Sequence, residues 1–267
     1  MQHWFKRKRI LLPVLGAALC FMLCACKGST IGTESRRLLS TTAPLSDEAD
    51  AVTALCNNLS GSADIDTYVI LNDGGTTING AGAAFSDQTL TITAPGTYSL
   101  KGSLSDGKIV VGSDVSGKIK LCLNGVDVSS GTDAPLQVDN SGQKVLLLLG
   151  EDSVNTFCCT ADDVPAAVSG GSVVEIAGDG TLVVTASVDT PALSDAVRLH
   201  GAGAGLYVHG SFAADAAVSI RDGENNEVVS FTLQQACKTV FVTAPTLQNG
   251  AVYTLDADGV SAEGTAQ

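Results

Sequence analysis

Basic residues are scarce in this sequence, which has 15 Lys and Arg against 28 Asp and Glu and a net charge of −13. Four of the basic residues lie at positions 6–9, in a segment that we interpret below as an export signal. The chain from residue 26 onward then keeps 11 basic residues against 28 acidic ones, a net charge of −17. Such a surface repels phosphate groups, so nucleic acid is excluded as a partner. An acidic polysaccharide would be repelled as well, unless a divalent cation bridged the two.

A long hydrophobic run is also missing. The uncharged stretch at 10–25 has 16 residues, fewer than the roughly 20 that a membrane-spanning helix needs, so it predicts an export signal. The residues Leu-Cys-Ala directly before Cys26 resemble the lipobox of bacterial lipoproteins, which implies a signal peptide at 1–25 and acylation of Cys26. A diacylated cysteine anchors a protein stably, so we expect a membrane contact through the lipid alone, on the extracellular face of the bacterial cell membrane. An ordinary signal peptide or an uncleaved anchor is the alternative.

The cysteines form no metal or disulfide pattern. Five follow Cys26, an odd number whose spacing matches no zinc site, and two of them are adjacent, which is poor geometry for a mutual bridge. We expect small, buried apolar side chains at these positions. They are Cys56, Cys122, Cys158, Cys159 and Cys237.

A repeat is the dominant feature of the sequence. Four runs of alternating apolar residues end on glycines at 125, 150, 178 and 201, in steps of 25, 28 and 23 residues. Counting back from each glycine predicts two inward columns, formed by Leu123, Leu148, Ile176 and Leu199 and by Leu121, Leu146, Val174 and Val197. A second short strand follows each run, at 126–128, 153–155, 182–184 and 206–208. A third segment follows the first three runs, at 134–138, 166–169 and 191–194.

Three short strands in each turn of about 25 residues are typical of a parallel β-helix. We therefore predict an all-β protein, a shortened right-handed parallel β-helix at 63–212 with antiparallel strands at 213–260. A tether at 26–62, with room for a short helix near 47–55, precedes it, and a tail at 261–267 follows. A β-propeller needs longer blades and a βαβ fold needs helices that are missing, whereas an antiparallel sandwich is the remaining alternative.

The same alignment predicts the outer face. Glu175 and Arg198 become stacked neighbours and a surface ion pair. Val145, Leu147 and Leu149 become an outward apolar patch, which soluble proteins seldom leave bare. We expect the C-terminal strands to cover it, because the stretches EVVSFTL, KTVFVTAP and AVYTL alternate in antiparallel style.

Several segments carry a family resemblance: TITAPGTYSLKGSLSDGKIVV (91–111), IKLCLNGVDVSSGTDAPLQV (119–138), VLLLLGEDSVNTF (145–157) and VVSFTLQQACKTVFVTAPTLQNGAVYTL (228–255). They resemble the clostridial-type carbohydrate-binding domain-containing surface lipoproteins, whose β-helix is related in shape to that of pectate lyases. The resemblance implies binding of cellulose or of acidic sugars such as polygalacturonate, with calcium as cofactor and without catalysis. This chain lacks several middle coils of the family and reads SGGS at 169–172, where the family often reads Ser-x-x-Asp. Asp189 and Asp195 remain as the candidate calcium ligands. The other interpretation of both is a solvated turn residue.

The chemistry of the side chains favours binding over catalysis. A lyase would need a basic residue beside a calcium ion, and no aspartate cluster accompanies the lysines. The scarcity of aromatic residues, 4% of the chain with its only tryptophan at Trp4, favours acidic glycans over cellulose. We predict a non-enzymatic, monomeric polysaccharide-binding protein, with a calcium-dependent lyase or a structural adhesin as alternatives. The candidate glycan contacts are Lys118, Lys120, Lys144, Arg198, His200 and Tyr207.

Overall fold

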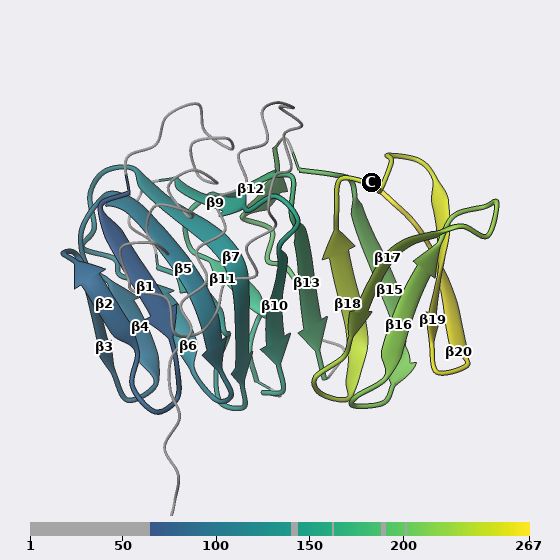
Figure 1. Cartoon of the computed structure of the whole chain (residues 1–267), viewed down its shortest axis with the longest axis horizontal. Helices are drawn as coiled ribbons and strands as arrows, with labels where there is room; N and C mark the ends of the chain where they lie inside the picture. Colours follow the sequence, from purple (N-terminus) through teal and green to yellow (C-terminus); the bar gives the residue numbers. More distant parts are fainter. Residues whose placement is uncertain (1–64, 140–143, 162, 188–190, 201) are drawn as a thin grey trace, which may run out of the picture. The chain divides into compact units, whose positions relative to one another are not determined.

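The computed structural model describes residues 65–267 with gaps at 140–143, 162, 188–190 and 201. Within these residues every regular element is a β-strand (Figure 1), and none of them holds a helix long and apolar enough to cross a bilayer. The predicted signal peptide, Cys26, the tether and Asp189 lie outside the described residues.

A β-solenoid of about five turns occupies residues 67–199, which confirms the predicted β-helix. Its strands are β1 (Thr67–Leu71), β2 (Thr77–Gly80), β3 (Ala83–Ser86), β4 (Thr89–Ile92), β5 (Gly96–Leu104), β6 (Lys108–Val111), β7 (Ile119–Ser130), β8 (Leu136–Val138), β9 (Val145–Leu149), β10 (Val154–Cys159), β11 (Val168–Gly170), β12 (Val174–Gly178), β13 (Thr181–Ala186) and β14 (Val197–Leu199).

Each turn contributes strands to three parallel ladders. The first ladder runs through β5, β7, β9, β12 and β14, the second continues from the far half of β7 into β10 and β13, and the third is the sheet β4, β6, β8 and β11. β7 serves two ladders because it bends at Gly125, whose φ of 76° lies in the left-handed region that favours glycine. The third segments align as predicted, since Val168 pairs with both Leu136 and Leu193.

The register of β9 differs from the prediction by one residue. Leu121 pairs with Leu147, where the glycine alignment placed Leu146. A one-residue slip turns every side chain of a strand to the opposite face. Val145, Leu147 and Leu149 are therefore fully buried inside the solenoid, and the predicted outward apolar patch of these three residues was wrong.

The outward residues of β9 are Leu146 and Leu148. They belong to a small apolar cluster with Cys122, Tyr68 and Ala177 on the outer face of the first ladder. The C-terminal strands continue the second ladder at the other end of the sheet order, so their predicted role as a cover of β9 was also wrong.

The C-terminal strands are β15 (Gly205–Phe212), β16 (Ala217–Arg221), β17 (Glu227–Thr232), β18 (Cys237–Thr243), β19 (Val252–Ala257) and β20 (Val260–Thr265). They include the three predicted antiparallel strands. β18 pairs antiparallel with both β13 and β15, so the segment at 206–208 does not continue the parallel repeat. Residues expected as a tail instead form β20, which pairs with β19 in a separate sheet ordered β17, β16, β19 and β20.

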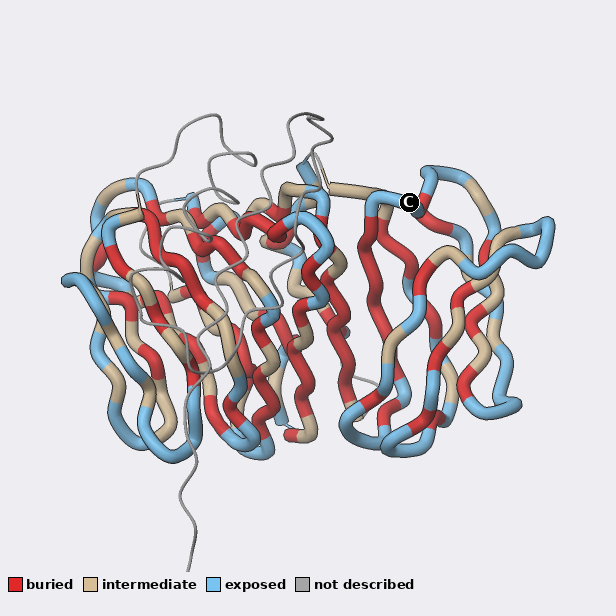
Figure 2. Tube along the Cα trace, viewed as in Figure 1, coloured by how far each residue is buried: buried red, intermediate tan, exposed pale blue. Residues whose placement is uncertain are grey.

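Two apolar cores result from this arrangement. The first fills the solenoid with the inward residues of its ladders and is closed at the last turn by Phe241 from β18. The second lies between the outer face of the β13, β18 and β15 strands and the C-terminal sheet, and includes Val183, Val240 and Leu255. Figure 2 shows these buried positions as red stretches along the strands. Cys122, Cys158, Cys159 and Cys237 are all buried free thiols.

Candidate polysaccharide-binding face

The first ladder carries a row of outward side chains. Thr97, Lys120, Leu146, Glu175 and Arg198 are paired in turn across β5, β7, β9, β12 and β14. Lys120 faces outward because its neighbours Ile119 and Leu121 fill the solenoid interior. Successive strands lie about 4.8 Å apart, so the row follows the long direction of the stacked turns.

Lysine side chains gather around this row. A hollow of about 440 Å³ is lined by Lys118, Ile119, Lys120, Lys144, Leu146 and Glu175, and we call it the lysine hollow. Lys118 and Lys144 directly precede Ile119 and Val145, which pair across β7 and β9. All three predicted lysines are thus brought together by the register of these two strands.

The charges of the lysine hollow do not cancel. Lys144 Nζ lies 2.6 Å from Glu175 Oε1, while Lys118 and Lys120 have no carboxylate partner in the part of the chain that the structure describes. Glu175 and Arg198 are stacked neighbours as predicted, but Glu175 pairs with Lys144. Among its described lining residues, three lysines and one glutamate leave an excess of two positive charges, which attracts an anionic group.

A second hollow lies at the last turn of the solenoid. It has a volume of about 270 Å³ and we call it the tyrosine hollow. Arg198 and Tyr207, two further predicted residues, both line it, together with Asp195, Phe241 and Gln267. His200, also predicted, is exposed and follows β14 next to this hollow without lining it.

Asp195 is the one candidate calcium ligand that the structure describes, and it is exposed at the rim of the tyrosine hollow. Its backbone carbonyl accepts a hydrogen bond from Arg198 Nη1, so a guanidinium cation already occupies its neighbourhood. Calcium takes six to eight oxygen ligands, and no group of three or more metal-ligating side chains is present among the described residues. Asp189, the other candidate ligand, lies outside the described residues, so calcium binding by this pair stays a prediction.

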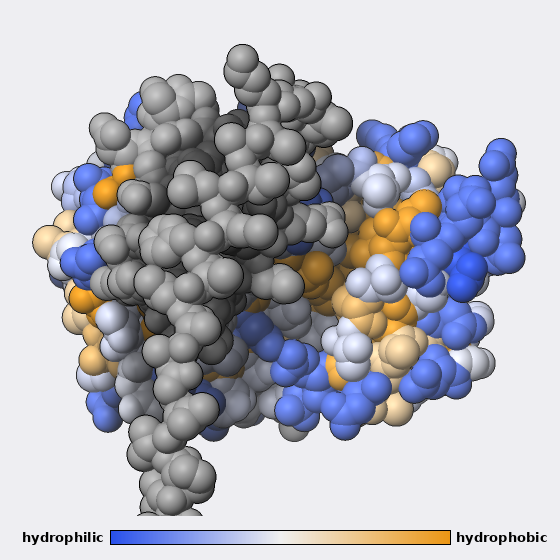
Figure 3. All heavy atoms as spheres, viewed as in Figure 1, coloured by the Kyte–Doolittle hydropathy of each residue, from blue (hydrophilic) through white to orange (hydrophobic). Residues whose placement is uncertain are grey.

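A third hollow, of about 510 Å³, lies between the turns that follow β9 and β12 and the strand β17. Its charged residues are Glu151, Asp152 and Asp179, so it repels an acidic glycan. Its apolar wall includes Val228 and Val229 of β17, and Figure 3 shows apolar residues gathered over this strand.

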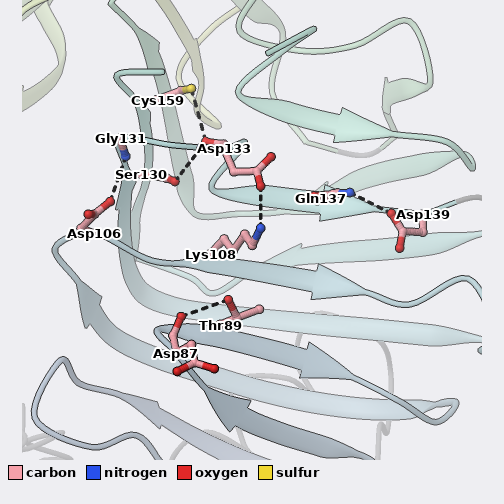
Figure 4. A network of polar contacts seen from close by, with 10 residues as sticks. All are labelled: Asp87, Thr89, Asp106, Lys108, Ser130, Gly131, Asp133, Gln137, Asp139 and Cys159. Atoms are coloured by element: carbon pink, nitrogen blue, oxygen red, sulfur yellow. Dashed lines mark hydrogen bonds and ion pairs between the residues drawn. The ribbon is translucent and has the colours of Figure 1, made fainter. Parts of the chain in front are cut away.

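Sequence reasoning missed a network of polar contacts at the third ladder (Figure 4). Lys108 Nζ lies 2.5 Å from Asp133 Oδ2, and the backbone nitrogen of Asp133 donates to Ser130 Oγ. Asp106 Oδ1 accepts from the nitrogen of Gly131 at 3.0 Å. This network joins the turn after β5 to the turn after β7. No local pattern marks it, because its partners are 25 residues apart.

Comparison with known proteins shows to which family the chain belongs. The model of the family described as "Carbohydrate-binding domain-containing protein" matches residues 86–229, just over half of the chain. The chain belongs to this family. A relative with the same description from Acetivibrio thermocellus (strain ATCC 27405) is 28% identical over 135 residues, which cover 47% of this chain and 47% of the relative. The chain therefore spans about half the length of that relative. No solved structure matches the chain.

Proposed function

We propose that this chain is a surface lipoprotein that binds an acidic polysaccharide through the lysine hollow and the outer face around it, without catalysis. The observation that carries the proposal is the convergence of Lys118, Lys120 and Lys144 on one hollow. Lysine is a mobile point charge that pairs with sugar carboxylates, and a solenoid offers one long face to an extended polymer. Membership in a carbohydrate-binding family supports a glycan as the ligand.

The lipid anchor at Cys26 and the extracellular location are parts of the same proposal. They rest on the signal segment and on the lipobox resemblance. Calcium enters the proposal as a bridging ion, shared between the acidic surface and the carboxylates of the sugar.

Affinity electrophoresis in gels that contain polygalacturonate tests the proposal. We expect the protein from residue 27 onward to be retarded, and a variant with Lys118, Lys120 and Lys144 all changed to Gln to lose most of the retardation. Lys238→Gln, an exposed lysine of β18 away from the hollow, is the matched control and should migrate like the unchanged protein. Gels that contain calcium or a chelator distinguish direct binding by the lysines from binding through a bridging calcium ion.

Two outcomes would contradict the proposal. Unchanged mobility in a panel of acidic glycans would favour a structural adhesin. Absorbance from unsaturated oligouronides, formed when the protein is incubated with polygalacturonate, would show a lyase.

A further inference from the structure

We propose that the tyrosine hollow binds a single neutral sugar ring of the polysaccharide, stacked on the exposed face of Tyr207. The inference rests on the proposed function only in taking a polysaccharide as the ligand. It adds a second site of different chemistry, in which charge attraction is replaced by contact with an aromatic ring.

Tyr207 forms a fixed aromatic platform at the end of the solenoid. The residue is 41% exposed, and its ring centroid lies 4.8 Å from that of Phe241 at an interplanar angle of 54°. The ring is thus held from behind by Phe241, and the C–H face of a pyranose can pack on the remaining face with little loss of side-chain entropy.

The polar groups of the tyrosine hollow suit hydroxyl groups. Arg198 Nη1 donates to the backbone carbonyls of Asp195 and of Val197, the latter at 2.9 Å, which fixes the guanidinium beside β14. A guanidinium has five N–H donors, so donors remain for a ligand, and the Asp195 carboxylate supplies acceptors. Because these two charges cancel, the hollow has no excess attraction for an anion.

The size of the tyrosine hollow limits its occupant. Its volume of about 270 Å³ lies just below the range of roughly 300–1,000 Å³ for pockets that enclose drug-sized ligands, so it fits one ring. Arg198 lies three strand steps along the outward row from Lys120, a separation of about 14 Å at the usual strand spacing. One polymer chain can therefore contact both hollows at once, and it should bind more tightly than a ligand that contacts only one of them.

Saturation-transfer NMR with single sugars tests this site. The probes are methyl glucopyranoside, methyl galactopyranoside and sodium galacturonate. We expect saturation of at least one neutral glycoside by the unchanged protein and by Tyr207→Phe, which keeps the ring. Tyr207→Ala should weaken binding about tenfold, as expected for the loss of an aromatic contact. Val252→Ala, at another exposed side chain, should have no effect.

Two further variants test the tyrosine hollow independently of Tyr207→Ala. Arg198→Gln changes an exposed side chain and should weaken binding of the neutral glycoside even if Tyr207→Ala proves unstable. The triple lysine variant should bind the neutral glycoside normally, which separates this site from the lysine hollow. No saturation of any neutral glycoside, or equal saturation in Tyr207→Ala, would overturn the proposal, and retardation by polygalacturonate would then still support the proposed function. Saturation transfer to galacturonate alone would overturn the proposal that the tyrosine hollow takes a neutral sugar.

Discussion

Asn155 Oδ1 lies 3.0 Å from the backbone nitrogen of Gly125, inside the solenoid at the bend of β7. The same oxygen accepts from the nitrogen of Val126, and Asn155 Nδ2 donates to Ser153 Oγ and to the carbonyl of Thr181. The asparagine side chain is fully buried, and its bonds to the nitrogen of Val126 and to Ser153 Oγ are buried as well, so these groups have no water as an alternative partner. One side chain thus joins three consecutive turns at the corner where the first ladder becomes the second.

Replacing Asn155 by Ala should destabilise the protein by about 1–3 kcal/mol, because the buried backbone N–H group of Val126 loses its acceptor. The free energy of unfolding in urea measures the change. Asn124→Ala is the matched control, since that side chain is half-buried and no hydrogen bond to it is present in the described part of the chain. A loss below about 0.5 kcal/mol for Asn155→Ala would show that these hydrogen bonds do not hold the corner.

The register of β9 can be tested by placing a carboxylate on each face of the strand. Leu147→Asp buries a charge in the solenoid core and should prevent folding or cost more than about 4 kcal/mol. Leu146→Asp changes a half-buried outward side chain and should cost clearly less, about 1–2 kcal/mol. Thermal unfolding of the two variants measures the difference. The reverse order of stability would restore the register that the glycine alignment predicted.

That register shows which parts of the fold the sequence could predict. In IKLCLNG the polar Lys120 between two inward residues marks the outer face, and Glu175 and Arg198 do so for β12 and β14. The run VLLLL at 145–149 has no polar residue, so its pattern fits either face. The alignment treated Gly150 as equivalent to Gly125, although of these two glycines only Gly125 has a positive φ and lies within a strand.

The candidate site was predictable to a similar extent. Lys118, Lys120 and Lys144 stand at the starts of aligned strands, so the repeat alone places them near one another. The environment of Tyr207 was not predictable, because β18 inserts between β13 and β15 from about 30 residues further along the chain. Long-range antiparallel pairing of this kind leaves no local pattern. The tyrosine hollow consequently depends on a contact that only the structure reveals.

Ionic strength and the substitution of Lys120 should show how much charge attraction contributes to binding at the lysine hollow. Lys120→Gln removes a charge without a carboxylate partner among the described residues and should weaken polygalacturonate binding about three- to fivefold, as for an exposed ion pair worth up to about 1 kcal/mol. Binding by the unchanged protein should weaken as ionic strength rises, since exposed charges are screened. Retardation at several salt concentrations measures both effects. Binding that is insensitive to salt and to Lys120→Gln would contradict a role for the lysine hollow.

Cys237 should make the protein sensitive to alkali. Burial, reinforced by the neighbouring Cys158, raises the pKa of the Cys237 thiol from 9.0 to about 12. Between these two values the unfolded chain has lost a proton that the folded protein retains, so stability falls as the pH rises, by up to roughly 1.4 kcal/mol per pH unit. Below pH 9 both states keep the proton and the thiol contributes no pH dependence.

The measurement is the free energy of unfolding between pH 8 and 11 for the unchanged protein and for Cys237→Ala. The variant loses some packing, so it should be less stable at pH 8, but its stability should fall less steeply above pH 9 because the titrating thiol is gone. Cys158 and Tyr207 also have raised pKa values and remain in both proteins. Their effect cancels in the difference between the two slopes, which isolates Cys237. Parallel curves for the two proteins would show that the thiol at 237 is accessible to solvent, and that β18 does not seal the second core at its first residue.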